Sequence, residues 1–179
     1  MVFIVMGISG SGKTTVGQEL ARRLNLPFYD ADDFHPGANI QKMANGQPLN
    51  DEDRRPWLDI LGRKIEEWEQ DRKGGAVLAC SALKESYRRK LATIPDDRLH
   101  WVLLDGTKKL IKRRMEQRKH HFFEAALIDS QLADLEKPDY GIHVDINQSP
   151  TEIVEVILKI LNNTYGRDEQ DNRGLYNSY

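Results

Sequence analysis

A glycine-rich loop follows an apolar run at the very start of the chain. Residues 2–6 (Val-Phe-Ile-Val-Met) are all apolar, which is typical of a strand buried on both faces of a parallel sheet. Residues 7–14 match G-x-x-x-x-G-K-[ST] at every fixed position, and apolar residues four apart (Val16, Leu20, Leu24) indicate that a helix follows. The N–H groups of such a loop and the helix N-terminus can bind phosphate oxygens. We therefore predict an α/β fold that binds a nucleoside triphosphate.

The loop motif also predicts what its individual residues do. Lys13 can reach the β- and γ-phosphates, and the hydroxyl of Thr14 can bind Mg²⁺. The alternative is a plain glycine turn before a helix, but such a turn does not require these fixed positions with these flanks. The expected nucleotide-binding residues are Gly7, Ile8, Ser9, Gly10, Ser11, Gly12, Lys13, Thr14 and Thr15.

Composition excludes several other classes of protein. The 179 residues are enough for one domain with a sizeable core. A formal charge of −2 does not indicate a general nucleic-acid binder, and the single cysteine, Cys80, excludes an internal disulfide framework. No apolar run reaches the roughly 18 residues that span a bilayer, and the N-terminal run leads into the phosphate loop instead of a cleavage site. We expect a cytoplasmic protein with no membrane or nucleic-acid partner.

A cluster of acids follows the second apolar segment. Residues 28–33 (Phe-Tyr-Asp-Ala-Asp-Asp) are expected to form a short strand that ends beside the phosphate loop, where α/β sheets bind ligands. In an extended segment Asp30 and Asp32 point to the same side and Asp33 points elsewhere. Phosphoryl transfer needs a metal organiser and a group that accepts a proton, so we assign Asp30 to the metal and Asp32 to catalysis. Asp33 could equally cap the next helix.

The segment 35–57 is rich in polar residues that periodicity does not explain. A short helix is expected here, with Ile40 and Met43 buried and Lys42 exposed. The helix after it carries an apolar stripe with helical spacing, which predicts a core-facing side. That stripe consists of Trp57, Leu58, Leu61, Ile65 and Trp68.

Three blocks of sequence closely resemble the gluconokinases, P-loop sugar-acid kinases related in fold to shikimate kinase. The first block starts with Tyr-Asp-Ala-Asp-Asp-Phe-His-Pro at 29–36 and continues to residue 58. The second is Cys-Ser-Ala-Leu-Lys at 80–84, after a predicted strand at 75–80, and the third is 114–122 with parts of 130–136. The resemblance implies a three-layer P-loop kinase fold with a mainly parallel sheet and a small helical lid at about 114–126. It also implies ATP, Mg²⁺ and gluconate as ligands.

Site residues follow from these blocks and from the residues themselves. Ser81, Lys84 and Arg88 follow a predicted strand, and a hydroxyl with two cations suits a polyhydroxy carboxylate. The lid is expected to bring Arg114 to the nucleotide and Arg118 to the moving phosphoryl group, as an arginine finger in cis. The expected substrate-binding residues are Asp32, His35, Asn39, Lys42, Arg54, Ser81, Lys84, Arg88, His121 and Gln131.

The end of the chain completes the predicted domain. Strands are expected at 100–104 and 142–146, and a last helix starts at Pro150, in a loop where related kinases hold adenine. We place the kinase domain at 1–162, with the substrate-binding helical segment at about 35–57. A polar tail without periodicity follows at 163–179 and is expected to be mobile.

The predicted reaction is transfer of phosphate from ATP to the terminal hydroxyl of D-gluconate, giving ADP and 6-phospho-D-gluconate. No guanine-recognition signature follows any predicted strand, which disfavours a GTPase, and Ser81 stands where an acidic metal ligand is often found. A kinase for another sugar acid or for shikimate is the first alternative. The second is a nucleotide-gated binding module whose basic helix at 108–119 holds RNA or a protein. A homodimer is kept as one option for the assembly.

Overall fold

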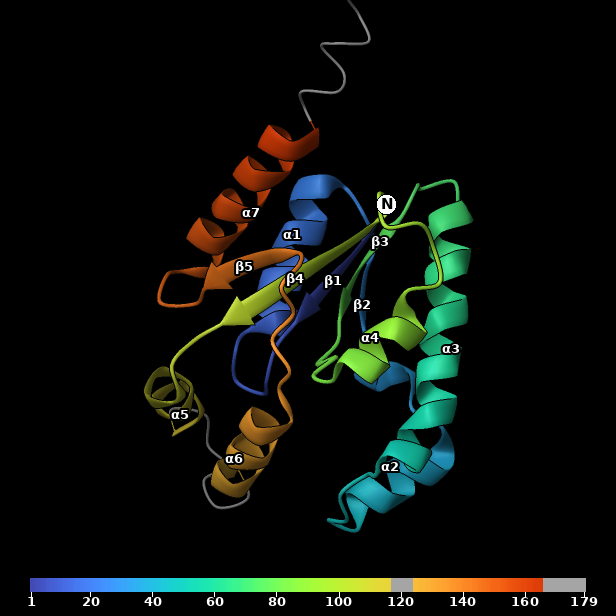
Figure 1. The fold of residues 1–179 in the computed structure, drawn as a ribbon, viewed down its shortest axis with the longest axis vertical. Helices are drawn as coiled ribbons and strands as arrows, with labels where there is room; N and C mark the ends of the chain where they lie inside the picture. Colours follow the sequence, from blue (N-terminus) through green and yellow to red (C-terminus); the bar gives the residue numbers. More distant parts are fainter. Residues whose placement is uncertain (117–123, 166–179) are drawn as a thin grey trace, which may run out of the picture.

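The central sheet consists of five parallel strands in the order β2-β3-β1-β4-β5 (Figure 1). The computed structural model describes residues 1–116 and 124–165. Because the strands run in the same direction, their carboxyl ends all meet at one edge of the sheet. The strands are β1 (Val2–Met6), β2 (Phe28–Asp30), β3 (Ala76–Ala79), β4 (Leu99–Asp105) and β5 (Ile142–Asp145).

Helices cover both faces of this sheet, which confirms the predicted three-layer α/β architecture. In Figure 1, α1 and α7 lie on one face and α3 and α4 on the other, while α2, α5 and α6 lie beyond the carboxyl ends of the strands. The helices are α1 (Lys13–Leu24), α2 (Gly37–Ala44), α3 (Asp51–Gln70), α4 (Glu85–Leu91), α5 (Lys108–Glu116), α6 (Glu124–Asp134) and α7 (Pro150–Tyr165), with a 3₁₀ turn, η1 (Ala31–Phe34).

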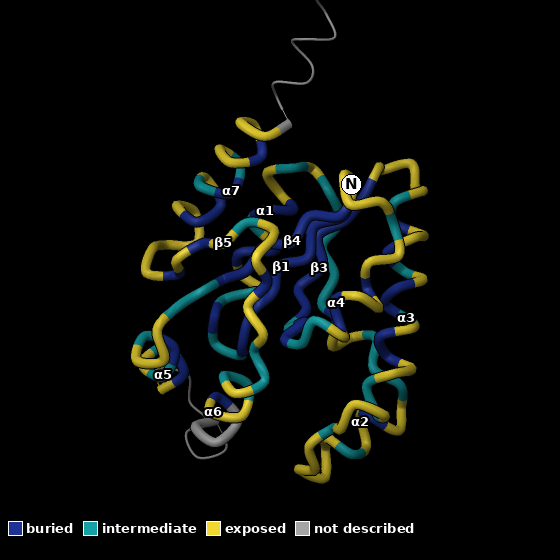
Figure 2. The backbone as a smooth tube through the Cα atoms, viewed as in Figure 1, coloured by how far each residue is buried: buried dark blue, intermediate teal, exposed yellow. Residues whose placement is uncertain are grey.

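The core has two halves because successive residues of a strand point to opposite faces. In β1, Phe3 and Val5 pack toward α1 and α7, whereas Ile4 and Met6 pack toward α3. Every residue of β1 is buried, as Figure 2 shows for the centre of the sheet. The predicted apolar stripe of α3 is also buried, which confirms its assignment to the core.

The expected burial pattern of α2 is wrong. Ile40 and Met43 are 52% and 42% exposed, whereas Asn39 is buried. Helix α2 projects beyond the sheet (Figures 1 and 2), and among the described residues its apolar side chains Ile40 and Met43 remain exposed. Asn39 points inward instead, because its side-chain amide donates a hydrogen bond to the backbone carbonyl oxygen of Asp53 at 2.9 Å. Lys42 is partly covered, since its ammonium group lies 2.5 Å from the Asp53 carboxylate.

The predicted start of the tail and the predicted lid can be compared with the structure. Helix α7 continues to Tyr165, so residues 163–165 are helical and the expected start of the tail is three residues too early. The rest of the tail, 166–179, and the centre of the predicted lid, 117–123, lie outside the described residues. Within 1–116 and 124–165, no helix is both long and apolar enough to cross a membrane.

Candidate functional site

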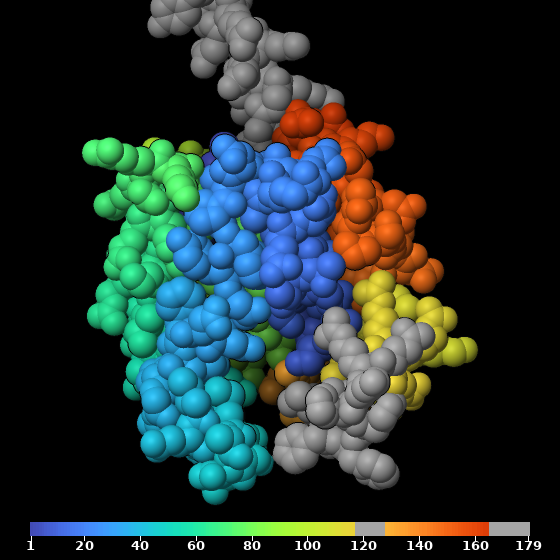
Figure 3. Space-filling model, turned by 180° about the vertical axis from the view of Figure 1, so that it is seen from behind, coloured from blue at the N-terminus to red at the C-terminus, as the bar shows by residue number. Residues whose placement is uncertain are grey.

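The ends of β1, β2 and β3 bring three predicted segments to one crevice. The loop after β1 contacts the turn after β3, where the amide of Gly7 donates to the carbonyl oxygen of Ser81 at 3.4 Å. The loop also contacts the end of β2, because the hydroxyl of Thr14 donates to Asp30 Oδ2 at 3.1 Å. Seen from behind in Figure 3, the surface is hollowed beside α2, and a dark blue segment from the N-terminal part of the sequence lies at the edge of this hollow.

The phosphate loop is already wound into a compact conformation. Gly10 and Gly12 have φ angles of +81° and +102°, which favour glycine over residues with a side chain. A Cβ atom at Gly10 would also lie 2.7 Å from Cγ of Met115, so α5 packs directly on the loop. The ammonium group of Lys13 donates to the carbonyl oxygen of Ile8 at 3.2 Å. The lysine thus folds back over the loop.

Two side chains from the lid side of the crevice contact this loop. The amide of Ser9 donates to Oε1 of Gln131 at 2.6 Å, which connects α6 to the loop. The guanidinium group of Arg114 donates to the carbonyl oxygens of Ser11 at 3.3 Å and Ile146 at 2.5 Å. Arg114 therefore joins the phosphate loop to the segment after β5. Pro150, the other residue assigned to the nucleotide, starts α7 four residues after Ile146.

The acidic segment differs from its expected form. The strand ends at Asp30, and residues 31–34 form the turn η1, so Asp30 and Asp32 do not alternate along one strand. Oδ1 of Asp30 accepts a hydrogen bond from the Asp32 amide at 3.2 Å and caps this turn. Reduced hydration beside the crevice wall, and then the Asp30 charge, raise the pKa of Asp32, although its side chain is 87% exposed. Asp33 does not cap α2, whose N-cap is Pro36.

His35 is packed behind Asp32 in a defined orientation. Its ring stacks on Trp57 with centroids 4.4 Å apart, and its side chain is only 6% exposed. Nδ1 of His35 lies 3.3 Å from the side-chain amide nitrogen of Asn39. An amide nitrogen only donates, so Nδ1 accepts, and the neutral ring carries its proton on Nε2, 3.8 Å from Asp32 Oδ1. Burial lowers the pKa of His35, which favours this neutral form.

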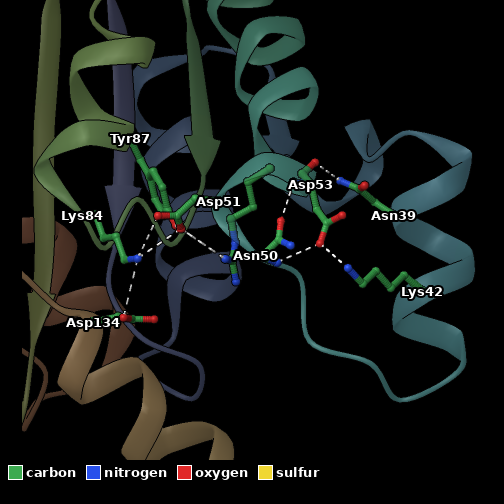
Figure 4. A network of polar contacts seen from close by, with 9 residues as sticks. Asn39, Lys42, Asn50, Asp51, Asp53, Lys84, Tyr87 and Asp134 are labelled. Atoms are coloured by element: carbon green, nitrogen blue, oxygen red, sulfur yellow. Dashed lines mark hydrogen bonds and ion pairs between the residues drawn. The ribbon is translucent and has the colours of Figure 1, made fainter.

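Lys84 lies between two walls of the crevice (Figure 4). Its ammonium group is 3.1 Å from Asp51 at the start of α3 and 3.8 Å from Asp134 at the end of α6. Asp51 also accepts a hydrogen bond from the Tyr87 hydroxyl and lies 3.9 Å from Arg54. The hydrogen bond to Asp51 raises the pKa of Lys84 and keeps it charged.

The sequence analysis missed three of these side chains, namely Asp51, Tyr87 and Asp134. Asp51 stands inside the first block that resembles the gluconokinases and Tyr87 lies three residues after the second, so the resemblance was a signal that could have identified them. Asp134 offered no comparable signal, because only the fold brings α6 next to Lys84.

The structure does not bring Arg88 to the crevice, contrary to our expectation. Lys84 is the N-cap of α4, and Arg88 points from that helix into the protein, where it is 1% exposed. Its guanidinium group is already bound to several protein oxygens. It therefore has no exposed face for a substrate.

The remaining predictions fall into two groups. Arg118 and His121 lie outside the described residues. The other expected residues lie at the crevice or in the polar cluster beside it: the phosphate loop, Asp30, Asp32, His35, Asn39, Lys42, Arg54, Ser81, Lys84, Arg114 and Gln131.

The residues near Thr14 can be tested for their fit to a metal. No group of three His, Cys, Asp or Glu side chains suited to a metal occurs within the described ranges. The neighbouring oxygens of Thr14 and Asp30 are nevertheless hard donors, which suit Mg²⁺. Magnesium in kinase sites commonly uses one or two protein ligands and completes its shell with phosphate oxygens and waters. The donor set therefore fits Mg²⁺ better than a metal that needs a full protein cage.

Comparison with known proteins gives consistent matches over almost the whole chain. A family model described as an AAA domain matches residues 4–164. The chain is 42% identical to a probable gluconokinase of Dictyostelium discoideum, covering 90% of this chain and 86% of that protein. It is 43% identical to a gluconokinase of Gluconobacter oxydans (87% and 88% covered).

Solved structures agree with these matches. A gluconokinase from Sinorhizobium meliloti has a TM-score of 0.80 at 38% identity, with 93% of this chain and 96% of that chain covered. Shikimate kinase from Aquifex aeolicus, with a TM-score of 0.59 at 21% identity and coverage of 92% and 98%, shares the fold.

Proposed function

The chain belongs to the gluconokinase family of P-loop kinases, and we propose that its crevice transfers the terminal phosphoryl group of ATP to the terminal hydroxyl of D-gluconate. The products are ADP and 6-phospho-D-gluconate. One observation carries this proposal: a wound phosphate loop lies in the same crevice as a wall of carboxylates, hydroxyls and cations. Because the reaction consumes ATP, we propose a cytoplasmic setting.

The nucleotide is assigned to the phosphate loop and to the lid side of the crevice. Backbone N–H groups of the loop and the N-terminus of α1 would bind the phosphates. Lys13 would neutralise the charge of the moving phosphoryl group, together with Arg118 of the lid. Arg114, which spans the loop and the segment after β5, would lie beside the nucleotide.

Thr14 and Asp30 would hold Mg²⁺, Thr14 through its hydroxyl and Asp30 as an acceptor in the outer shell. When bound, the ion supplies positive charge that stabilises the phosphates during transfer.

Gluconate requires partners for several hydroxyls and one carboxylate. Asp32 would accept a hydrogen bond from the terminal hydroxyl, with His35 packed behind it. Arg54 and Lys84 are the cations assigned to the carboxylate, and Ser81, whose backbone contacts the phosphate loop, would supply a hydroxyl. A nucleoside acceptor would need an apolar or aromatic slot for its base. This polar wall therefore favours a polyhydroxy acid.

The chemical step forms one bond and breaks one bond. The terminal hydroxyl oxygen of gluconate bonds to the γ-phosphorus while the bond from that phosphorus to the β–γ bridging oxygen breaks. The hydroxyl proton moves to Asp32 and then to solvent. In a loose transition state this proton leaves late, so Asp32 contributes mainly by orienting the hydroxyl.

A coupled assay of ADP release tests the proposal. Specificity constants for gluconate, glucose, shikimate and AMP are measured, and gluconate is expected to be the best substrate by far. Lys84→Met should raise the KM for gluconate more than the KM for ATP. Lys90→Met is the matched control, because Lys90 pairs with Asp59 on the outer surface. A preference for glucose, shikimate or AMP would contradict the proposal, and ADP release that no acceptor stimulates would favour a nucleotide-gated binding module.

A further inference from the structure

Arg88 is the most deeply buried cation among the described residues, and each of its three guanidinium nitrogens has protein partners. Its Nη1 donates to the carbonyl oxygens of Ala82 and Leu83 at 2.8 and 3.0 Å. Its Nη2 donates to the carbonyl oxygen of Glu136 at 2.7 Å and lies 2.9 Å from the Glu85 carboxylate. Its Nε is within 3.0 Å of Glu85 Oε2 and the Tyr140 hydroxyl. The protein thus occupies the donors on every nitrogen of the guanidinium group.

The turn that Arg88 holds has an unfavourable backbone conformation. Ala82 has a φ angle of +43°, in the left-handed region that residues with a Cβ atom rarely adopt. Such a conformation persists only where the surroundings determine it. The two hydrogen bonds from Nη1 end on this residue and the next one, so Arg88 is positioned to stabilise the turn.

The same turn makes contacts at the crevice on both sides of Ala82. The carbonyl oxygen of Ser81 accepts from Gly7 of the phosphate loop at 3.4 Å. Lys84, two residues after Ala82, lies between Asp51 and Asp134 (Figure 4). A change in the turn would therefore move the Ser81 backbone against the phosphate loop and the Lys84 ammonium group at the crevice.

Arg88 also ties this turn to the segment that follows α6. Besides the bond from Arg88 to its carbonyl oxygen, Glu136 donates its own amide to Leu83 at 3.0 Å. Its carboxylate accepts from the Glu85 amide at 2.6 Å. Since α6 carries Gln131 and Asp134 into the crevice, one buried cation connects the substrate side to the lid side.

We infer that Arg88 is a positioning residue, whose buried guanidinium group fixes the turn at Ala82 and the segment at Glu136 so that Ser81 and Lys84 face gluconate correctly. The expected effect of Arg88 on gluconate kinetics rests on the proposed function, whereas its expected effect on the turn at Ala82 does not. A positioning residue acts through other groups. Its effect on gluconate must therefore depend on the side chains that it positions.

The first experiment measures kinetics of folded variants. Arg88→Lys keeps the charge but loses the planar set of donors. Because small displacements of binding groups have large kinetic effects, it should raise the KM for gluconate by about tenfold and leave the KM for ATP within about twofold. Tyr140→Phe removes one partner of Arg88 and provides a milder variant that should change the KM for gluconate in the same direction. Arg89→Lys is the matched control, since Arg89 is 80% exposed on the same helix.

A double-mutant cycle separates positioning from direct contact. Ser81→Ala and Lys84→Met are combined, and Arg88→Lys is then added to this background. If Arg88 acts through these two side chains, the added substitution has little further effect on the KM for gluconate. A full additional loss would mean that Arg88 contacts the substrate itself and would overturn the inference. An unchanged KM for gluconate in Arg88→Lys would overturn it as well.

A second measurement does not depend on activity. Amide hydrogen exchange of Glu85 and Glu136 in Arg88→Lys should be at least about tenfold faster than in the wild type, relative to the amides of α7. Unchanged protection would overturn the structural half of the inference. If the wild type does not phosphorylate gluconate, the proposed function fails, and faster exchange would still support the role of Arg88 in fixing the turn.

Discussion

The hydroxyl of Thr14 donates a hydrogen bond to Oδ2 of Asp30 at 3.1 Å, and this contact joins the first turn of α1 to the end of β2. The oxygen of a hydroxyl that donates its proton still has lone pairs that can bind a cation. Asp30 in turn uses its other oxygen to cap the turn that carries Asp32. The pair therefore couples the position of a proposed metal ligand to that of the proposed catalytic carboxylate.

Substitution of the three neighbouring acids should separate their roles. Asp30→Asn should raise the Mg²⁺ concentration for half-maximal activity, because the charge beside Thr14 is lost. Asp32→Asn should lower kcat and leave the Mg²⁺ dependence unchanged. Asp33→Asn is the control, since Asp33 is exposed and does not cap α2. Titration of each variant with Mg²⁺ is the measurement, and identical metal curves for the Asp30 and Asp32 variants would contradict the assignment.

Replacement of Lys13 should stop the reaction without unfolding the protein. Lys13→Met keeps the aliphatic stem but removes the cation aimed at the transferred phosphate. Loss of one such contact in a transition state costs about 3–4 kcal/mol, so kcat should fall by at least about 10²- to 10³-fold. Thermal denaturation should remain close to that of the wild type. Near-normal turnover by a folded variant would show that Lys13 has another role.

Local sequence patterns predicted most of the fold. Three segments could be predicted without knowledge of the rest of the chain: the apolar run of β1, the phosphate loop and the stripe of α3. In the strand and the helix, spacing within the segment determines which side is buried. The motif also places Lys13 next to its loop in the sequence, so no distant contact is needed to bring the two together.

Arg88 and α2 could not be predicted in the same way. Whether Arg88 points outward or inward depends on the turn at Ala82 and on a carbonyl oxygen 48 residues away, at Glu136. The exposure of Ile40 and Met43 depends on the position of α2 beyond the sheet, which helical spacing does not encode. Residues of the site were therefore predicted well where they belong to a motif and poorly where tertiary contacts orient them.

Acidification should destabilise the protein through two buried histidines. Burial lowers the pKa values of His35 and His100 below the ordinary value of about 6.5. At pH values between these lowered pKa values and about 6.5, the unfolded chain binds more protons than the folded chain. The contribution of the two neutral histidines to the free energy of unfolding is therefore complete above about pH 6.5 and is lost as the pH falls. The loss is at most about 1.4 kcal/mol per pH unit for each histidine.

Thermal denaturation between pH 7.5 and 5.5 checks this dependence. The Tm of the wild type should fall with pH, and His35→Gln and His100→Gln should each make the fall smaller. His143→Gln, at an exposed histidine of β5, is the control and should follow the wild type. An equally steep fall in both buried-site variants would show that other groups cause the acid sensitivity.

Gln131, which we assigned to gluconate from the sequence, should instead affect ATP more, because its side-chain carbonyl accepts the Ser9 amide of the phosphate loop at 2.6 Å. Gln131→Glu can still accept this bond but places a negative charge beside the phosphates, whereas Gln131→Ala only removes the acceptor. Like charges repel strongly where water is partly excluded. Gln131→Glu should therefore weaken ATP binding by about tenfold or more, and Gln131→Ala by less, since water can replace the lost partner of a half-buried amide.

Calorimetric titration with ATP, without gluconate, measures this difference directly and does not depend on turnover. Asp129→Asn is a suitable control, because Asp129 lies on the same helix but pairs with Lys108 at the surface. Its affinity for ATP should equal that of the wild type. Equal or tighter binding of ATP by Gln131→Glu would mean that Gln131 lies too far from the phosphates to sense their charge. Its contact with Ser9 would then serve only to hold α6 against the loop.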